Sequence, residues 1–100
     1  MKTKTIFISG AVSNISPIRA MHNFNTAEYV LKNEKEIDRV INPTKICRDD
    51  WPWWLCMVVC LFNLIFKADA IYMLYNWKES RGAKIEHKAA RIFGKEIWYE

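Results

Sequence analysis

The sequence lacks three features that would each define a class of protein. It has no dense stripe of basic residues interleaved with aromatic side chains, as a nucleic-acid binder usually shows, and its net charge of +4 is spread among acidic residues. It has no internal repeat and no low-complexity stretch. Its longest apolar run, Trp51 to Phe66, is interrupted by Pro52 and Asn63 and is shorter than the roughly 20 residues that span a bilayer. We therefore expect no nucleic-acid partner and no membrane partner.

The same apolar run leaves one alternative open. Trp51, Trp53 and Trp54 crowd at one end of it, and Trp residues at the end of an apolar segment are typical of membrane-interface anchors. A helix buried in the protein or between two copies accounts for the same residues, because a helix that is apolar all round is buried wherever it lies. We favour burial, with a homodimer or higher homo-oligomer formed through the helix from Trp51 to Phe66.

The three cysteines are an odd number with no signal peptide before them, so we expect a cytoplasmic protein. Cys56 and Cys60 lie one helical turn apart, which is half of a metal site. No further Cys or His stands close enough in sequence to complete tetrahedral coordination, so buried thiols are the favoured interpretation. We expect neither a metal ion nor an organic cofactor.

The sequence does contain strand-like and helix-like segments that alternate, which is typical of an α/β protein. Its length predicts one domain spanning residues 1–100. Ser16 and Pro17 form a helix-start pair, Asp50 is expected to cap the Trp51–Phe66 helix, and Ser80 is expected to cap the last helix. Four strands and three helices alternate with short connections, which predicts a flavodoxin-like three-layer sandwich with a four-stranded parallel sheet of order 2-1-3-4. The expected strands are Thr5–Ser9, Arg39–Asn42, Ala70–Leu74 and Glu96–Tyr99, and the expected helices are 17–33, 51–66 and 80–93.

A ligand site is expected outside the carboxyl ends of the strands, where the strand order reverses. Glu86 lies in the second turn of the last helix, on the face that carries the small residues Ala83 and Ala90. That face should meet the sheet, which is an unusual place for a carboxylate. The alternative is a surface Glu86 paired with Lys84 or Arg91.

One family combines these features, and the residues that carry the resemblance extend over nearly the whole chain. These residues are Ile6–Gly10, Phe24 with Ala27-Glu28, Val40–Pro43, Ala68–Leu74, Asn76-Trp77, Ser80, Gly82-Ala83, Glu86 and Ala90. In them the chain resembles the DUF4406 proteins, a small bacterial and phage family that is similar to nucleoside 2-deoxyribosyltransferases. The resemblance implies that Glu86 is the nucleophile and that a nucleoside or nucleotide is the substrate. The residues that the resemblance and the expected turns place around the substrate are Ser9, Gly10, Asn42, Asn76, Ser80 and Gly82.

Three positions depart from the transferase pattern. Ser80 stands where the transferases carry an Asp six residues before the nucleophile, although serine is usual there in the smaller family. Phe7 stands where the transferases carry an aromatic hydroxyl, commonly Tyr, and Leu61 stands where they carry an Asp. Three hypotheses about function therefore stand, and one of them is a small membrane-associated or interaction protein that uses the Trp-rich helix. The other two concern the site around Glu86. The first is an enzyme that cleaves or transfers the N-glycosidic bond of a deoxynucleoside or its monophosphate through Glu86. The second is a module that binds or sequesters a nucleotide without turnover.

Overall fold

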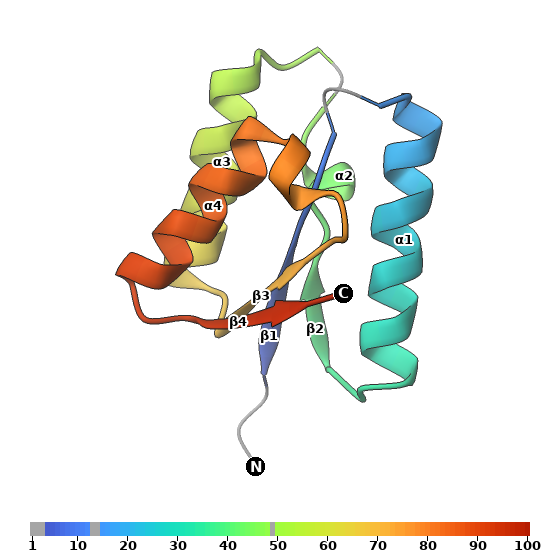
Figure 1. The fold of residues 1–100 in the computed structure, drawn as a ribbon, viewed down its shortest axis with the longest axis vertical. Helices are drawn as coiled ribbons and strands as arrows, with labels where there is room; N and C mark the ends of the chain where they lie inside the picture. The colour runs from blue at the N-terminus through green and yellow to red at the C-terminus, as the bar shows by residue number, and fades with distance from the viewer. Residues whose placement is uncertain (1–3, 13–14, 49) are drawn as a thin grey trace.

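The computed structural model describes residues 4–12, 15–48 and 50–100 as strands and helices that alternate along the chain (Figure 1). Over most of its length the element order is the one that the sequence predicts. Two short elements in the order, α2 and η1, were not predicted. In chain order the elements are β1 (Thr5–Ser9), α1 (Pro17–Asn33), β2 (Arg39–Ile41), α2 (Pro43–Ile46), α3 (Trp53–Phe66), β3 (Ala70–Met73), a 3-10 turn η1 (Trp77–Glu79), α4 (Arg81–Ile92) and β4 (Glu96–Tyr99).

The four strands form one all-parallel sheet in the order β2-β1-β3-β4, which confirms the predicted topology. In register, Ser9 at the end of β1 lies beside Met73 at the end of β3. The strand order reverses between the neighbouring strands β1 and β3, because β2 lies on one side of them and β4 on the other. The turns that follow β1 and β3 therefore diverge from the same edge of the sheet. This edge is where a ligand site is expected.

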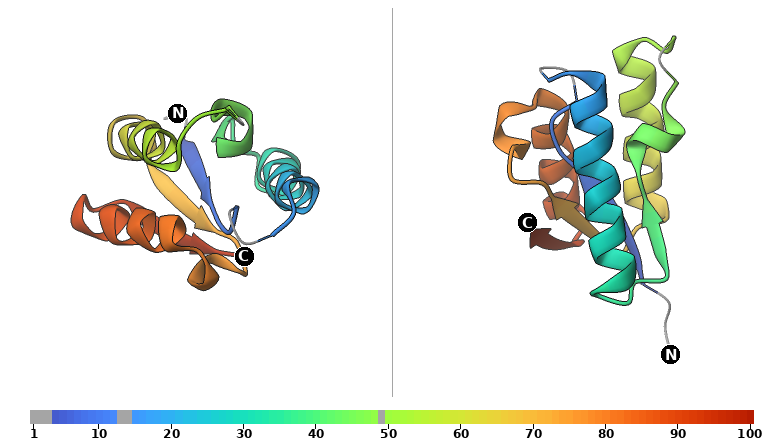
Figure 2. Two further views of the ribbon diagram at one scale, coloured as in Figure 1. Left: turned by 90° about the horizontal axis from the view of Figure 1, so that it is seen from above. Right: turned by 90° about the vertical axis from the view of Figure 1, so that its right-hand side faces the viewer.

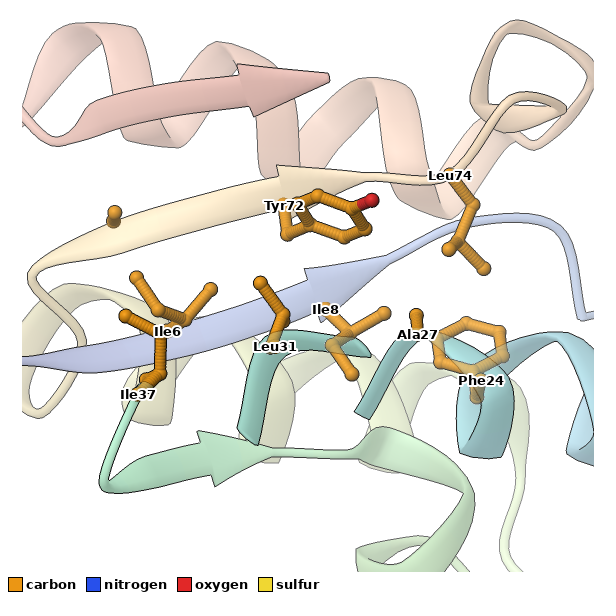
Figure 3. Packing of buried hydrophobic residues seen from close by; sticks show 9 residues of the cluster. Ile6, Ile8, Phe24, Ala27, Leu31, Ile37, Tyr72 and Leu74 are labelled. Carbon is orange, nitrogen blue, oxygen red and sulfur yellow. The ribbon is translucent and has the colours of Figure 1, made fainter. Parts of the chain in front are cut away.

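Successive side chains of β1 point to opposite faces of the sheet and supply two separate cores. Ile6 and Ile8 pack on the face covered by α1, together with Phe24 and Leu31 of that helix (Figure 3). Phe7 belongs to the second core, on the face covered by α3 and α4, and the two helical layers lie on either side of the strands in Figure 2. Ser9 is two residues after Phe7 and therefore faces α3 and α4 as well.

Capping residues fix the ends of α1 and α4 as predicted. The hydroxyl of Ser16 accepts a hydrogen bond from the backbone N–H of Arg19, and the hydroxyl of Ser80 accepts one from Ala83. Gly94, one residue past the cap of α4, has a φ of +69°, a conformation that a glycine adopts without strain. These local signals place Glu86 in the second turn of α4.

The start of α3 differs from the prediction. The helix begins at Trp53 rather than Trp51, with Pro52 at the N-cap position and no side-chain capping hydrogen bond, so Asp50 does not cap it. Pro52 has an extended ψ of 152°, and its carbonyl accepts hydrogen bonds from Leu55 and Cys56. Helix α2 was not predicted either, although Asn42 and Pro43 form a helix-start pair of the same kind as Ser16 and Pro17. It is a single turn that Asn42 caps by accepting a hydrogen bond from the backbone N–H of Thr44.

Helix α3 is buried on one side only. Met57, Cys60 and Leu64 point into the protein, whereas Trp54, Val58, Phe62 and Phe66 are each more than half exposed. Among the residues that the structure describes, no helix is both long and apolar enough to cross a membrane.

Candidate functional site

The site is built from the carboxyl end of β1 and the first two turns of α4. Ser9 is the last residue of β1 and is completely buried, and Glu86 is 6% exposed on the inner face of α4. The hydroxyl of Ser9 donates a hydrogen bond to Oε1 of Glu86 over 2.6 Å. Glu86 therefore faces the sheet as predicted, and the alternative of a surface residue paired with Lys84 or Arg91 is wrong.

The environment of Glu86 favours its neutral form. Ala83 and Ala90 on the same helix face are buried and apolar, and no described residue forms an ion pair with the carboxylate. Burial raises the pKa of Glu86 to about 7, and the hydrogen bond from Ser9 lowers it only in part. A carboxyl group poised near neutral pH can accept or give up a proton, or attack an electrophile, under ordinary conditions.

A cleft opens beside Glu86 in two chambers. The inner chamber has a cavity volume of about 80 Å³ and is mostly apolar, with Glu86 and Ser80 among its few polar residues. The outer chamber has a volume of about 370 Å³. Val12, Pro43, Trp53 and Cys56 line both chambers, so the two are adjacent. The inner chamber is smaller than the roughly 150 Å³ cavity that holds a benzene ring, so it would admit part of a ligand, and the larger remainder would occupy the outer chamber.

Close contacts hold the mouth of this cleft in place. The guanidinium of Arg81 lies 4.7 Å from the ring centroid of Trp53, which joins the first turn of α4 to the first turn of α3. A Cβ on Gly82 would lie 2.9 Å from Sδ of Met57, so glycine permits the close approach of the two helices. Trp53 is a site residue that the prediction left out, because its part in the cleft depends on where α3 begins.

The structure brings five of the predicted site residues together. Gly10, Ser80, Gly82 and Glu86 line the inner chamber, and Ser9 contacts it through Glu86. A Cβ on Gly10 would lie 2.5 Å from Cδ1 of Leu74, so the turn after β1 has no space for a side chain.

Asn76 and Asn42 contribute in a different way from the other five. Asn76 is buried, and its side-chain oxygen accepts a hydrogen bond from the backbone N–H of Ala11 over 3.1 Å, which ties the turn after β3 to the turn after β1. The Asn42 amide donates to Asn25 and Glu28, each over 3.0 Å. Neither asparagine is among the residues lining the inner chamber, so their observed contacts shape the loops around it.

Asn42 belongs to a polar cluster centred on Glu28. Lys32 and Lys45 each form an ion pair with this carboxylate over 2.9 Å. Burial alone would raise the pKa of Glu28, but hydrogen bonds from Lys45, Asn42 and Lys32 outweigh it and lower the pKa to about 2. Glu28 and Glu86 are thus two buried carboxyl groups whose pKa values shift in opposite directions. Two lysines keep Glu28 ionised, whereas Glu86 has no described cation beside it and favours its neutral form.

Phe7 and Leu61 occupy the side of the sheet on which Glu86 lies. Phe7 is fully buried in the core between the sheet and the helices α3 and α4, and Leu61 packs against the same core. Both side chains are apolar and neither lines the inner chamber, so neither supplies a proton donor or acceptor to it.

The cysteines differ from the expectation of free buried thiols. Cys47, just after α2, forms a disulfide with Cys56 in the first turn of α3, and Cys60 is free and buried. The sequence gave no reason to bring Cys47 to the other two, because the turn that returns the chain from α2 to α3 is a tertiary feature. Cys56 and Cys60 both line the inner chamber beside Glu86.

The fold and site together define a doubly wound parallel α/β domain with a buried carboxyl group at the carboxyl edge of its sheet. A comparison with protein-family models matches residues 4–99 to DUF4406, a domain of unknown function. The chain belongs to this family, as the resemblance indicated. Comparisons with curated proteins and with solved structures gave no match.

Proposed function

We propose that the cleft binds a nucleoside or nucleotide and that Glu86 acts as the nucleophile in cleavage or transfer of its N-glycosidic bond. The observation that supports this most is the buried Glu86 carboxyl group, held by Ser9 at the wall of a cleft and free of any described cation. A carboxylate paired with lysine would be a weaker nucleophile. One held only by a hydroxyl keeps an oxygen available for attack.

The proposed reaction proceeds in two displacements. An oxygen of the ionised Glu86 attacks the anomeric carbon of the sugar while the bond from that carbon to the base nitrogen breaks. The base leaves with the electron pair of that bond and takes up a proton. Water or a second base then attacks the glycosyl ester and releases Glu86, so that the sugar keeps its original configuration. The hydrogen bond from Ser9 orients the carboxyl group throughout.

The two chambers suit the parts of such a substrate. The anomeric carbon of the sugar would reach the inner chamber beside Glu86, with Ser80 and the first turn of α4 near the sugar hydroxyl groups or a 5′-phosphate. The base would extend between Val12 and Trp53 into the outer chamber, which Met21 and Arg48 also line. Apolar walls with a few polar groups are typical of a small-molecule site. We place this activity in the cytoplasm, where nucleosides and nucleotides occur as metabolites.

The test is incubation with a panel of deoxynucleosides and deoxynucleoside monophosphates, followed by chromatography for free base. We expect release from at least one substrate, and we expect Glu86→Gln to lower the rate by at least about a thousandfold because the nucleophile is lost. Glu34→Gln, at an exposed position next to α1, is the matched control and should keep the full rate.

A second function is favoured by the apolar residues around Glu86. Phe7 and Leu61 supply no group to protonate the departing base, so a module that binds or sequesters a nucleotide is the alternative. A thermal shift with one panel member, with no release of base from any, would establish binding without turnover and overturn the enzymatic proposal.

We also propose that two copies associate through α3. The four large residues of this helix that are more than half exposed recur every four positions, and the helix carries no charged residue. Such a ridge packs against a copy of itself by ridges-into-grooves contact. Phe62→Glu should convert a dimer to a monomer in sedimentation, whereas Ile18→Glu, which changes a still more exposed apolar residue on α1, should not. A monomeric unmodified protein would contradict the proposal.

A further inference from the structure

Three sulfur atoms meet where α2 and α3 approach the cleft. Sγ of the free Cys60 lies 3.8 Å from Sγ of Cys47 and 3.9 Å from Sγ of Cys56. All three sulfur atoms lie within 4.8 Å of one another, and these three residues are the complete set of cysteines in the chain. We call this group the cysteine cluster. Its members come from two elements, and the cluster borders both chambers of the cleft.

Cys60 is poorly placed for thiol–disulfide exchange with the Cys47–Cys56 disulfide. A thiolate attacks a disulfide along the axis of the S–S bond, whereas Cys60 is almost equally far from both sulfur atoms and therefore lies beside that bond. Burial, with a smaller contribution from the nearby Glu86 carboxylate, also raises the pKa of Cys60 to about 12, so its reactive thiolate form is scarce.

The same arrangement suits a shared metal ion. Two thiolates bound to one zinc ion at about 2.3 Å and at a tetrahedral angle are about 3.8 Å apart. The two sulfur–sulfur distances that involve Cys60 already have this value. Only the separation of Cys47 and Cys56 is too short, and that separation is set by the disulfide.

We propose that, once the Cys47–Cys56 disulfide is reduced, the cysteine cluster binds one thiophilic divalent cation of the zinc class. A small thiol or phosphine supplies two electrons, becomes oxidised, and leaves two protein thiols. The cation then displaces three protons, one from each cysteine, and three sulfur–metal bonds form. A bound cation deprotonates its thiol ligands outright, which overcomes the reluctance of Cys60 to ionise.

The structure provides three protein ligands for this site, because no described His, Asp or Glu joins the cysteine cluster. Three protein ligands leave one position of a tetrahedral ion for water or an exogenous ligand. Cys56 and Cys60 line the inner chamber together with Glu86, so the cation would lie at the wall of the proposed nucleotide cleft. It would also replace the disulfide as the link between α2 and α3.

The experiment is a titration of the reduced, full-length protein with Cd²⁺, a spectroscopic substitute for Zn²⁺, without oxygen and after removal of the reductant. We expect a sulfur-to-cadmium charge-transfer absorbance that saturates at one ion per chain, and displacement of Cd²⁺ by competing Zn²⁺. The oxidised protein has two of its sulfur atoms locked in the disulfide and should give no such band.

Variants identify the ligands. Cys60→Ser and Cys47→Ser should each weaken binding by more than about 100-fold. Met57→Leu removes the other sulfur atom that lines the inner chamber and should bind as the unmodified protein does. Far-ultraviolet circular dichroism checks that each variant is folded, and Cys60→Ala provides a second substitution if Cys60→Ser is not.

Two results would overturn the proposal. One is the absence of stoichiometric binding by the reduced protein, and the other is binding by folded Cys60→Ser that is as tight as that of the unmodified protein. A reduced protein that loses helical signal and regains it with one equivalent of cation would support the proposal, because binding would then be coupled to folding.

Discussion

Replacing Glu86 with glutamine should stabilise the protein at neutral and alkaline pH. The pKa of Glu86 is raised from an ordinary value of 4.5 to about 7 in the folded protein, because burial penalises the charged carboxylate. Glutamine has nearly the same shape, carries no charge, and its side-chain oxygen still accepts the hydrogen bond from Ser9. The substitution therefore isolates the cost of the buried charge.

The sign and size of the effect follow from proton linkage. Below pH 4.5 Glu86 is neutral in both the folded and the unfolded states and costs nothing. Between pH 4.5 and pH 7 the unfolded chain ionises while the folded protein keeps its proton, so the free energy of unfolding falls as the pH rises. Above pH 7 the loss is complete, and the shift in pKa corresponds to about 3 kcal/mol.

The assay is urea unfolding, followed by tryptophan fluorescence, at pH 4 and at pH 8 with the disulfide kept oxidised. At pH 8 we expect Glu86→Gln to unfold at a urea concentration higher by roughly 1.5 to 3 M than the unmodified protein, since a domain of this size loses about 1 to 2 kcal/mol per molar urea. At pH 4 the two midpoints should nearly coincide.

Glu28→Gln is the matched control, because the same chemical change should act in the opposite direction. The pKa of Glu28 is lowered to about 2, so its ionised form stabilises the fold above pH 4.5, and this stability is lost as the pH falls toward 2. Glu28→Gln should therefore be less stable than the unmodified protein at pH 8, by up to about 3 kcal/mol. If Glu86→Gln gave no stabilisation at pH 8, or the same stabilisation at pH 4, the reasoning about Glu86 would be refuted.

Further predictions concern packing and can be checked by thermal or urea unfolding. Gly10→Ala should destabilise the protein by more than about 2 kcal/mol, because the new Cβ would lie 2.8 Å from Cβ of Leu74, an atom fixed to the backbone. Gly94→Ala meets no atom within 4 Å and should cost only about 1 kcal/mol, for the strain of its positive φ, so equal losses for the two variants would contradict this account. Leu64→Ala should cost about 2 to 5 kcal/mol, because Leu64 is fully buried between α3 and the sheet, and a loss under 1 kcal/mol would show that the core refills the space.

The sequence was most informative where structure depends on neighbouring residues. The apolar run Thr5–Ser9, the capping residues Ser16 and Ser80, and Gly94 after α4 each mark an element through contacts within a few positions, and the structure confirms all four. The alternation of strands and helices then permits few topologies, since parallel crossovers are right-handed. The predicted sheet order followed from that constraint.

The segment from Asn42 to Pro52 was beyond such reasoning. Its single-turn helix α2 is too short for a periodic pattern, and Pro52 rather than Asp50 marks the start of α3. The disulfide joins Cys47 of this segment to Cys56 in the first turn of α3. A contact of this kind depends on the path of the chain in space, which no local pattern encodes.

The sequence by itself determined that Glu86 lies on the helix face that carries Ala83 and Ala90, because helical spacing alone fixes which side chains share a face. Only the tertiary structure decided that this face meets Ser9 at the end of β1 and that three cysteines gather at the wall of the same cleft. The raised pKa of Glu86 arises from that packing, since the cost of a charge depends on everything that excludes water from it.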